Sequence, residues 1–200
     1  MREKIFKNQP RRVVYIYSTK SDFVDELYQE KLIDKAIKKL PPTYEKLEEI
    51  VAPFYQEGLI LIVDDGLSQM EGYLPKVFEE FTSKNNCSVI FVSQSIFVED
   101  KNFVRLSNNC HSIVFMANRR NTARIKRLAQ QVKPCNQAFI TNCFVDATKF
   151  KRLKSSSPQK YGFGYFILEF DLKSPEVLMC RTNIFPEEVE PITIYVETSE

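Results

Sequence analysis

Short apolar runs rich in β-branched and aromatic residues alternate along the chain with segments whose apolar residues recur three and four positions apart. The continuous apolar runs predict strands buried on both faces. They lie at Val13 to Tyr17, Leu59 to Val63, Ser88 to Val92, Ser112 to Met116, Tyr165 to Phe170 and Val177 to Arg181. The three-and-four spacing predicts amphipathic helices. It occurs at Leu47 to Phe54, Leu74 to Phe81, Ile125 to Val132 and Phe139 to Ala147.

Strands that alternate with helices predict an α/β protein with a mostly parallel sheet and helices on both of its faces. The last two strands are separated by a Lys-Ser-Pro turn and predict a C-terminal β-hairpin. Thr43, which follows two prolines, is expected to cap the helix after it. Ligands of parallel sheets bind beyond the carboxyl ends of the strands, so we expect the chemistry to lie there.

The chain of 200 residues is long enough for one sizeable core. We expect one domain over residues 1–186 and an acidic C-terminal tail over residues 187–200. The formal net charge is +2, but Glu187 to Glu200 contains five acids and no base, so the other residues carry a charge of +7. This excess favours an anionic partner.

The five cysteines are an odd number without Cys-x-x-Cys spacing, and no signal peptide is evident at the N-terminus. Both features predict free thiols in a reducing compartment, the cytoplasm or nucleus, or a virion if the protein is viral. His111 is the only histidine and is expected simply to open a strand, which leaves little for histidine-based zinc or triad chemistry. No apolar run has membrane-spanning length, so no membrane partner is expected.

Two carboxylates, Asp64 and Asp65, directly follow the apolar run that ends at Val63. An apolar strand that ends in an acid is the Walker B arrangement, in which one carboxylate holds Mg²⁺ and a second can activate water. The alternative is a strand that emerges into a polar Asp-Asp-Gly turn. Gln94 follows the next strand and could sense a γ-phosphate or position water; alternatively, it caps that strand as an ordinary polar residue.

Five segments in this order resemble one protein family: LILIVDDGLSQM, SVIFVSQSIF, SNNCHSIVFMANRR, ARIKRLAQQVKP and GYFILEFDLKSPEVLMCRTNIFPEE. The family is the packaging-ATPase branch of the FtsK–HerA superfamily of P-loop NTPases, found in poxvirus-like large DNA viruses and Polinton-type mobile elements. The resemblance spans roughly Val13 to Glu188. It implies a RecA-like fold, ATP and Mg²⁺ as cofactors, and a homo-oligomeric ring that drives double-stranded DNA into a capsid.

The resemblance also implies roles for individual residues. Asp64 corresponds to the Mg²⁺-linked Walker B acid and Asp65 to the catalytic carboxylate, where many relatives carry Glu. Gln94 corresponds to the polar sensor. Arg119 or Arg120 could act as an arginine finger on the nucleotide of a neighbouring subunit, whereas either arginine alone could belong to a solvated basic turn.

The family's first strand and its phosphate-binding loop, G-x-x-x-x-G-K-[ST], are absent from this sequence, because none of its five glycines opens such a loop. Either the sequence is an N-terminally truncated form of a complete ATPase, inactive alone, or it is a degenerate, non-enzymatic remnant that binds DNA or a capsid partner. In the family the absent strand lies between the strands that match Ser88 to Val92 and Ser112 to Met116. Its loss should leave unpaired strand edges and bare apolar faces.

Basic residues gather in two places that could contact the DNA backbone without reading its sequence. One set, in the predicted helix that follows the fourth strand, is Arg124, Lys126 and Arg127. The other set, in a basic and serine-rich segment predicted as a loop from Lys149 to Lys160, is Lys151, Arg152 and Lys154. The alternative for both sets is an ordinary solvated surface.

Overall fold

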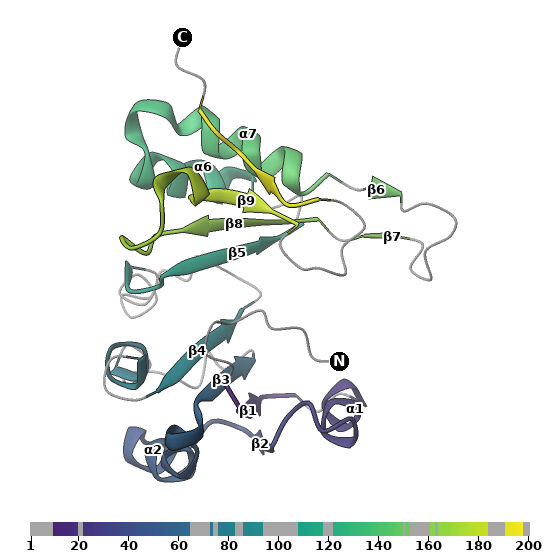
Figure 1. The fold of residues 1–200 in the computed structure, drawn as a ribbon, viewed down its shortest axis with the longest axis vertical. Helices are drawn as coiled ribbons and strands as arrows, with labels where there is room; N and C mark the ends of the chain where they lie inside the picture. The colour runs from purple at the N-terminus through teal and green to yellow at the C-terminus, as the bar shows by residue number, and fades with distance from the viewer. Residues whose placement is uncertain are drawn as a thin grey trace. The chain divides into compact units, whose positions relative to one another are not determined.

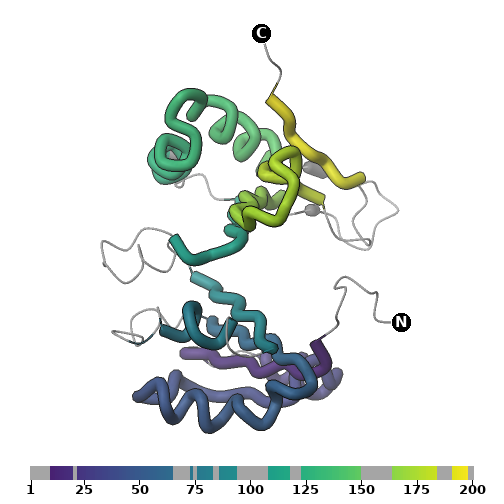
Figure 2. The backbone as a smooth tube through the Cα atoms, turned by 60° about the vertical axis from the view of Figure 1, so that its left-hand side comes forward, coloured from purple at the N-terminus to yellow at the C-terminus, as the bar shows by residue number. Residues whose placement is uncertain are grey.

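The computed structural model describes residues 10–19, 22–64, 73, 76–82, 86–93, 108–117, 122–149, 151–152, 161–162, 164–183 and 191–197. The chain divides into two compact units, Met1–Asn109 and Cys110–Glu200. Figure 2 traces the backbone through the purple and blue first unit into the green and yellow second unit. Each unit has its own sheet and its own core, and each is described separately.

The first unit is built on a four-stranded sheet in the order β2-β1-β3-β4, and all neighbouring strands are parallel. Its strands are β1 (Arg12–Tyr17), β2 (Lys35–Lys38), β3 (Leu59–Asp64) and β4 (Cys87–Val92). The helical segments between them are α1 (Asp22–Gln29), α2 (Tyr44–Val51), η1 (Ala52–Glu57) and η3 (Val77–Phe81). The predicted parallel sheet is therefore confirmed for β1, β3 and β4 (Figure 1).

Helix α2 begins and ends where local chemistry requires it. Thr43 caps its N-terminus by accepting a 3.3 Å hydrogen bond from the amide of Lys46, as predicted. The α-helix stops at Val51 rather than continuing to Phe54, because Pro53 lacks the amide hydrogen that a helix interior needs. The chain continues as the short 3-10 helix η1 up to Gly58, whose φ of 80° favours glycine.

The two faces of the parallel sheet pack against different helices. On one face, Phe78 of η3 lies edge-on to Phe91 of β4, with ring centroids 6.5 Å apart. Phe81 of η3 lies 5.3 Å from the ring of Tyr44 in α2, so η3 and α2 cover this face together. On the opposite face, a cluster of Tyr15, Val24 and Ile33 packs α1 against β1, with Ile62 of β3 at its border.

Among the described strands, β4 lies at one edge of this sheet and β2 at the other. Ile90 pairs in register with Ile62, and Val92 pairs in register with Asp64. Ile90 and Val92 are 45% and 44% exposed, so the apolar face beside α1 extends beyond the part that the described residues bury.

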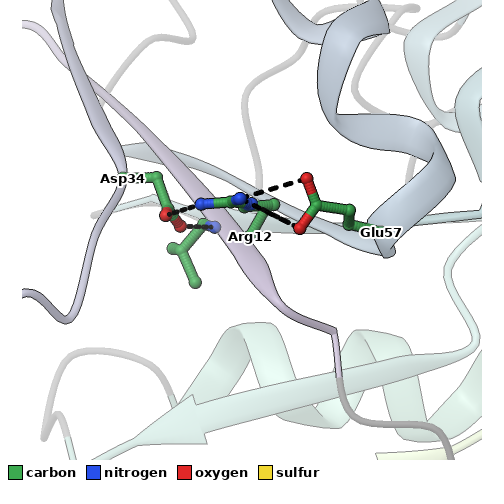
Figure 3. A network of polar contacts seen from close by, with 4 residues as sticks. Arg12, Asp34 and Glu57 are labelled. Atoms are coloured by element: carbon green, nitrogen blue, oxygen red, sulfur yellow. Dashed lines mark hydrogen bonds and ion pairs between the residues drawn. The ribbon is translucent and has the colours of Figure 1, made fainter.

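Arg12 joins three segments at the amino end of the sheet (Figure 3). Its guanidinium bonds Asp34 at 2.9 Å and both carboxylate oxygens of Glu57, at 3.0 and 3.1 Å. Asp34 also accepts a 2.7 Å hydrogen bond from the amide of Val13. This network ties the start of β1 to the entries of β2 and β3, at the end of the sheet opposite to Asp64.

The second unit contains a four-stranded sheet in the order β10-β9-β8-β5, and all neighbouring strands are antiparallel. Its strands are β5 (Ser112–Met116), β8 (Tyr165–Glu169), β9 (Cys180–Thr182) and β10 (Thr193–Ile194). The prediction that Ser112 to Met116 adds to a parallel sheet is wrong for the described strands, because this strand pairs antiparallel with β8. An apolar run specifies burial and does not specify strand direction.

Two helices cover one face of the antiparallel sheet (Figure 1). They are α6 (Thr122–Val132) and α7 (Gln137–Ala147), joined by the short turn η5 (Pro134–Asn136). Phe115, Phe144 and Phe166 form the centre of this core, with ring centroids 6.3 to 6.4 Å apart. Gly164 lets β8 begin against the end of α7, because a Cβ atom there would lie 2.3 Å from the carbonyl oxygen of Ala147.

Two further segments of the second unit differ from their predicted form. Lys151–Arg152 (β6) pairs antiparallel with Tyr161–Gly162 (β7), so the segment predicted as a loop has a paired end. The last predicted strand starts at Cys180 rather than Val177, because Glu176–Leu178 (η6) forms a 3-10 turn. Pairing in such short strands depends on backbone hydrogen bonds, which leave little trace in hydrophobic periodicity.

The end of the chain packs onto the second unit through β10 and the residues after it. The hydroxyl of Tyr195 donates a 3.0 Å hydrogen bond to Asp146 on α7. The carboxylate of Glu197 pairs with Lys133 and accepts a hydrogen bond from Asn136. Part of the acidic C-terminal segment is thus integrated into the fold.

Candidate functional site

Asp64 is the last residue of β3, a strand flanked by β1 and β4 in the parallel sheet. It lies in register with Tyr17 of β1 and with Val92 of β4, so three neighbouring strands end together at this edge. The carboxylate is partly buried. The structure therefore puts Asp64 at the carboxyl edge of a parallel sheet, where the sequence pattern predicts it and where such sheets bind their ligands.

The carboxylate of Asp64 is held by a tyrosine of the neighbouring strand. The hydroxyl of Tyr15 donates a 2.8 Å hydrogen bond to Oδ2 of Asp64. Tyr15 is only 8% exposed and packs with Val24 and Ile33. The strands and the core beneath α1 thus fix the position of the hydroxyl, which orients one oxygen of Asp64 and leaves Oδ1 outside this bond.

Tyr15 remains a hydrogen-bond donor over a wide pH range. Burial raises the pKa of its phenol to about 12, and the hydrogen bond to Asp64 and the charge of that carboxylate contribute further. Sequence patterns did not single out Tyr15, because it reads as one aromatic residue within a buried strand. The only indication in the sequence was general: a tyrosine in a buried strand usually has a hydrogen-bond partner for its hydroxyl, but the sequence does not show which residue that partner is.

This arrangement suits a magnesium ion that is bound mainly by other groups. Mg²⁺ commonly keeps several waters and uses one or two carboxylates together with substrate phosphates. Within the described part of the chain, no group of three or more His, Cys, Asp and Glu residues is placed to hold a metal. Asp64 could take part in such a site through Oδ1, the oxygen that Tyr15 does not bond.

The other predicted catalytic residues lie outside the described residues: Asp65, Gln94, Arg119 and Arg120. Asp65 follows Asp64 directly, and Gln94 lies two positions after the end of β4. Their proposed roles thus concern positions next to the strand ends described above, and the roles stay predictions.

The predicted basic helix is confirmed as an amphipathic helix. Ile125 and Ala129 of α6 are fully buried, whereas Arg124, Lys126 and Arg127 are exposed. Lys133, just beyond the helix, pairs with Glu197. Charged side chains therefore emerge from one face of α6, and its opposite face is anchored in the core.

The second basic set is described only in part. Lys151 and Arg152 form β6 of the short ribbon, but their side chains, like Lys154 as a whole, lie outside what the structure describes.

Comparison with protein-family models, with curated proteins and with solved structures finds no match to this chain. The first unit is an α/β unit with a parallel four-stranded sheet, and this architecture is compatible with a Rossmann-like fold. None of the helices in the described ranges is both long and apolar enough to cross a membrane.

Proposed function

We propose that this chain provides the Walker B part of an ATPase of the FtsK–HerA packaging branch, which drives duplex DNA into a capsid with ATP and Mg²⁺. The observation that carries the proposal is the position of Asp64. Its carboxylate ends an apolar strand that has parallel neighbours on both sides, and Tyr15 orients it at the ligand-binding edge.

In this proposal each residue at the strand ends has a separate task. Asp64 would hold Mg²⁺, directly or through a water molecule, and the bound ion would supply positive charge to the phosphates of ATP. Asp65 orients or deprotonates the attacking water. Gln94 detects the γ-phosphate without adding charge. Arg119 or Arg120 reaches the nucleotide of the next subunit in a homo-oligomeric ring.

A Walker B acid does not hold a triphosphate alone, so the ATPase also needs a phosphate-binding loop that the 200 residues of this chain do not contain. In the family that this chain resembles, the strand that leads into the loop lies beside the strand that matches β4. The outer position of β4 among the described strands suits such a neighbour, since the backbone groups along an outer strand can pair with a further strand. The exposed side chains of Ile90 and Val92 would let the apolar face beside α1 continue onto it.

The DNA contact in this proposal uses the exposed side of α6. Arg124, Lys126 and Arg127 contact backbone phosphates, which gives affinity without sequence preference. A packaging motor needs this property because it must move along any sequence. A capsid protein is the expected partner of the ring.

One experiment separates the ATPase from a non-enzymatic remnant that only binds DNA. The genomic DNA upstream of the Met1 codon is sequenced, and an in-frame strand, phosphate-binding loop and helix are expressed together with this chain. We expect Mg²⁺-dependent ATP hydrolysis that Asp64→Asn abolishes. If no such loop is encoded, or if the complete protein turns over normally with Asp64→Asn, the ATPase proposal fails.

A further inference from the structure

The last strand of the second unit presents apolar side chains to solvent. β10, in yellow next to the C-terminal end of the chain in Figure 1, is an outer strand of the antiparallel sheet among the described strands. Exposed and half-buried side chains alternate along residues 192–196. The exposed ones are Ile192, Ile194 and Val196, which are 61%, 40% and 60% exposed. These three side chains share one face of the extended chain and form what we call the β10 row.

The side chains that alternate with the β10 row hold this segment on the second unit. Tyr195 packs edge-on against Phe166 of β8, with ring centroids 6.4 Å apart, and its hydroxyl bonds Asp146 of α7. Glu197 pairs with Lys133. Because these contacts fix one face of the segment, the β10 row stays on the other face and cannot turn inward without breaking them.

The backbone groups of the β10 row point away from β9. In an antiparallel pair, alternate residues direct both their amide and their carbonyl toward the same neighbouring strand. The amide of Tyr195 donates a 2.9 Å hydrogen bond to the carbonyl oxygen of Cys180, and Thr193 lies opposite Thr182 in the same register. The intervening residues therefore direct their amides and carbonyls outward, where a further strand could pair with them.

This edge lacks the charges that usually prevent an outer strand from pairing. β2, at an edge of the parallel sheet, has the exposed lysines Lys35 and Lys38, and lysine is a common protection of strand edges. The segment from Ile192 to Val196 contains no charged residue. An exposed and uncharged edge of alternating β-branched residues favours the addition of a strand.

The charges around the segment indicate which strand fits. Residues 187–200 contain five acids and no base, with Glu190 before the β10 row and Glu197 after it. When Lys133 is counted against its partner Glu197, five minus one leaves a formal charge of −4. Pairing with β10 of a second copy would bring two such acidic segments together, and they would repel each other. A strand with basic ends would be attracted instead.

We propose that β10 is a docking edge for an extended segment of a protein partner, which has apolar residues at every second position and Lys or Arg beyond both ends. The partner strand pairs with the outward backbone groups of Ile192, Ile194 and Val196, and its apolar side chains widen the β10 row. Its basic ends lie near the acids of residues 187–200. This edge belongs to the second unit and does not include Asp64, so docking does not depend on ATP hydrolysis.

The test uses the full chain and a fluorescent synthetic peptide, Lys-Lys-Val-Thr-Val-Thr-Val-Lys-Lys, with fluorescence anisotropy as the measure of affinity. We expect saturable binding that weakens roughly tenfold or more when glutamates replace the lysines of the peptide. A peptide that is N-methylated at every valine and threonine keeps its charges but cannot donate backbone hydrogen bonds, so it should not bind. In hydrogen-exchange NMR, the amides of Ile194 and Val196 should gain protection when the peptide binds.

Two sets of variants locate the contact on β10. Ile194→Pro removes an outward amide that β9 does not use, so the sheet should still form and the peptide should no longer bind; Ile194→Val keeps the amide and should bind normally. Ile192→Ser with Val196→Ser removes most of the β10 row and should weaken binding roughly tenfold. The matched pair, Leu172→Ser with Val177→Ser, changes two other exposed apolar residues of the second unit and should have no effect.

Four results would each overturn the proposal. They are the absence of binding by the lysine-ended peptide, equal binding of the glutamate-ended or N-methylated peptide, equal losses in the two serine pairs, and normal binding by a folded Ile194→Pro variant. Size-exclusion chromatography with light scattering examines the protein alone. A dimer that Ile194→Pro dissociates would also overturn the proposal, because it would assign this edge to a second copy of the chain.

Discussion

The hydroxyl of Tyr15 and the carboxylate of Asp64 are joined by a 2.8 Å hydrogen bond between neighbouring strands of the parallel sheet. Tyr15 lies in register with Ile62, two positions before Asp64, so the hydroxyl reaches diagonally toward the strand end. The core beneath α1 holds the ring, and the ring holds the carboxylate. The orientation of the Asp64 carboxylate therefore depends on the packing of Tyr15 against Val24 and Ile33.

This bond predicts the response of the protein to alkaline pH. Because the folded protein raises the pKa of Tyr15 to about 12, from a value near 10 in the unfolded chain, the folded state keeps a proton that the unfolded state loses. The stabilising contribution is complete below a pH of about 10 and is lost as the pH rises to about 12. Tyr15→Phe should lower the free energy of unfolding by about 1 kcal/mol near neutral pH, since Asp64 loses its donor.

Urea denaturation over a pH series measures both effects. The variant should lose stability less steeply than the wild type above a pH of about 10, because phenylalanine does not ionise. Other buried tyrosines are present in both proteins, so the difference isolates Tyr15. Tyr28→Phe, at an exposed position of α1, is the matched control and should leave the curve unchanged. Parallel curves for Tyr15→Phe and wild type would contradict the prediction.

The second prediction concerns catalysis in a protein completed by a phosphate-binding loop. Asp65→Asn should abolish ATP hydrolysis and leave nucleotide binding unchanged, because the substitution removes a proton acceptor at nearly constant size. Steady-state turnover and a fluorescent ATP analogue give the two readouts. For the present chain without such a loop, Mg²⁺ and ATP should hardly change the melting temperature. Normal turnover of Asp65→Asn would reassign the base to another acid.

The third prediction concerns the packing of β8 against α7. Gly164→Ala should destabilise the second unit by about 1 to 3 kcal/mol, because a Cβ atom would lie 2.3 Å from a backbone oxygen of Ala147 and the strand must shift. Thermal unfolding with a probe in the second unit measures the loss. Ser174→Ala, in the turn between β8 and β9, is a control that should have little effect. An unchanged melting temperature for Gly164→Ala would contradict the prediction and would mean that the start of β8 can move away from Ala147 at little cost in stability.

The parts of the fold that the sequence predicts are those encoded by local patterns. The continuous apolar run before Asp64 identified β3 and its carboxyl end, and the spacing of Ile125, Leu128 and Ala129 identified α6. The sequence pattern did not predict strand β2, because Lys35–Lys38 is a short edge strand with two exposed lysines. Its position depends on pairing with β1, and such a contact is not encoded in four residues.

Contacts between distant segments explain what was missed at the candidate site. Tyr15 and Asp64 are 49 positions apart, and neither residue's neighbours in the sequence indicate the other. The antiparallel direction of β5 likewise follows from its pairing with β8 rather than from its apolar run. The Tyr15–Asp64 bond and the direction of β5 depend on tertiary contacts, whereas hydrophobic periodicity predicts only the individual helices and strands.

The fourth prediction concerns DNA. Reversing the charges of Arg124, Lys126 and Arg127 to glutamate should weaken binding to unrelated duplexes by about the same factor, because phosphate contacts carry no sequence information. Each lost contact should reduce the slope of log affinity against log salt by roughly one. The helix should still fold, since Ile125 and Ala129 keep their places in the core.

Fluorescence anisotropy over a salt series, with size-exclusion chromatography of each protein, provides the measurement. A matched variant reverses three exposed lysines elsewhere, Lys35, Lys38 and Lys173, and changes the net charge equally. If only the net charge of the protein mattered, both variants would lose the same affinity for DNA and the same slope of log affinity against log salt. A larger loss for the α6 variant assigns phosphate contacts to that helix. Equal losses in monodisperse proteins would make α6 an ordinary solvated surface and would direct attention to the segment around Lys151 and Arg152.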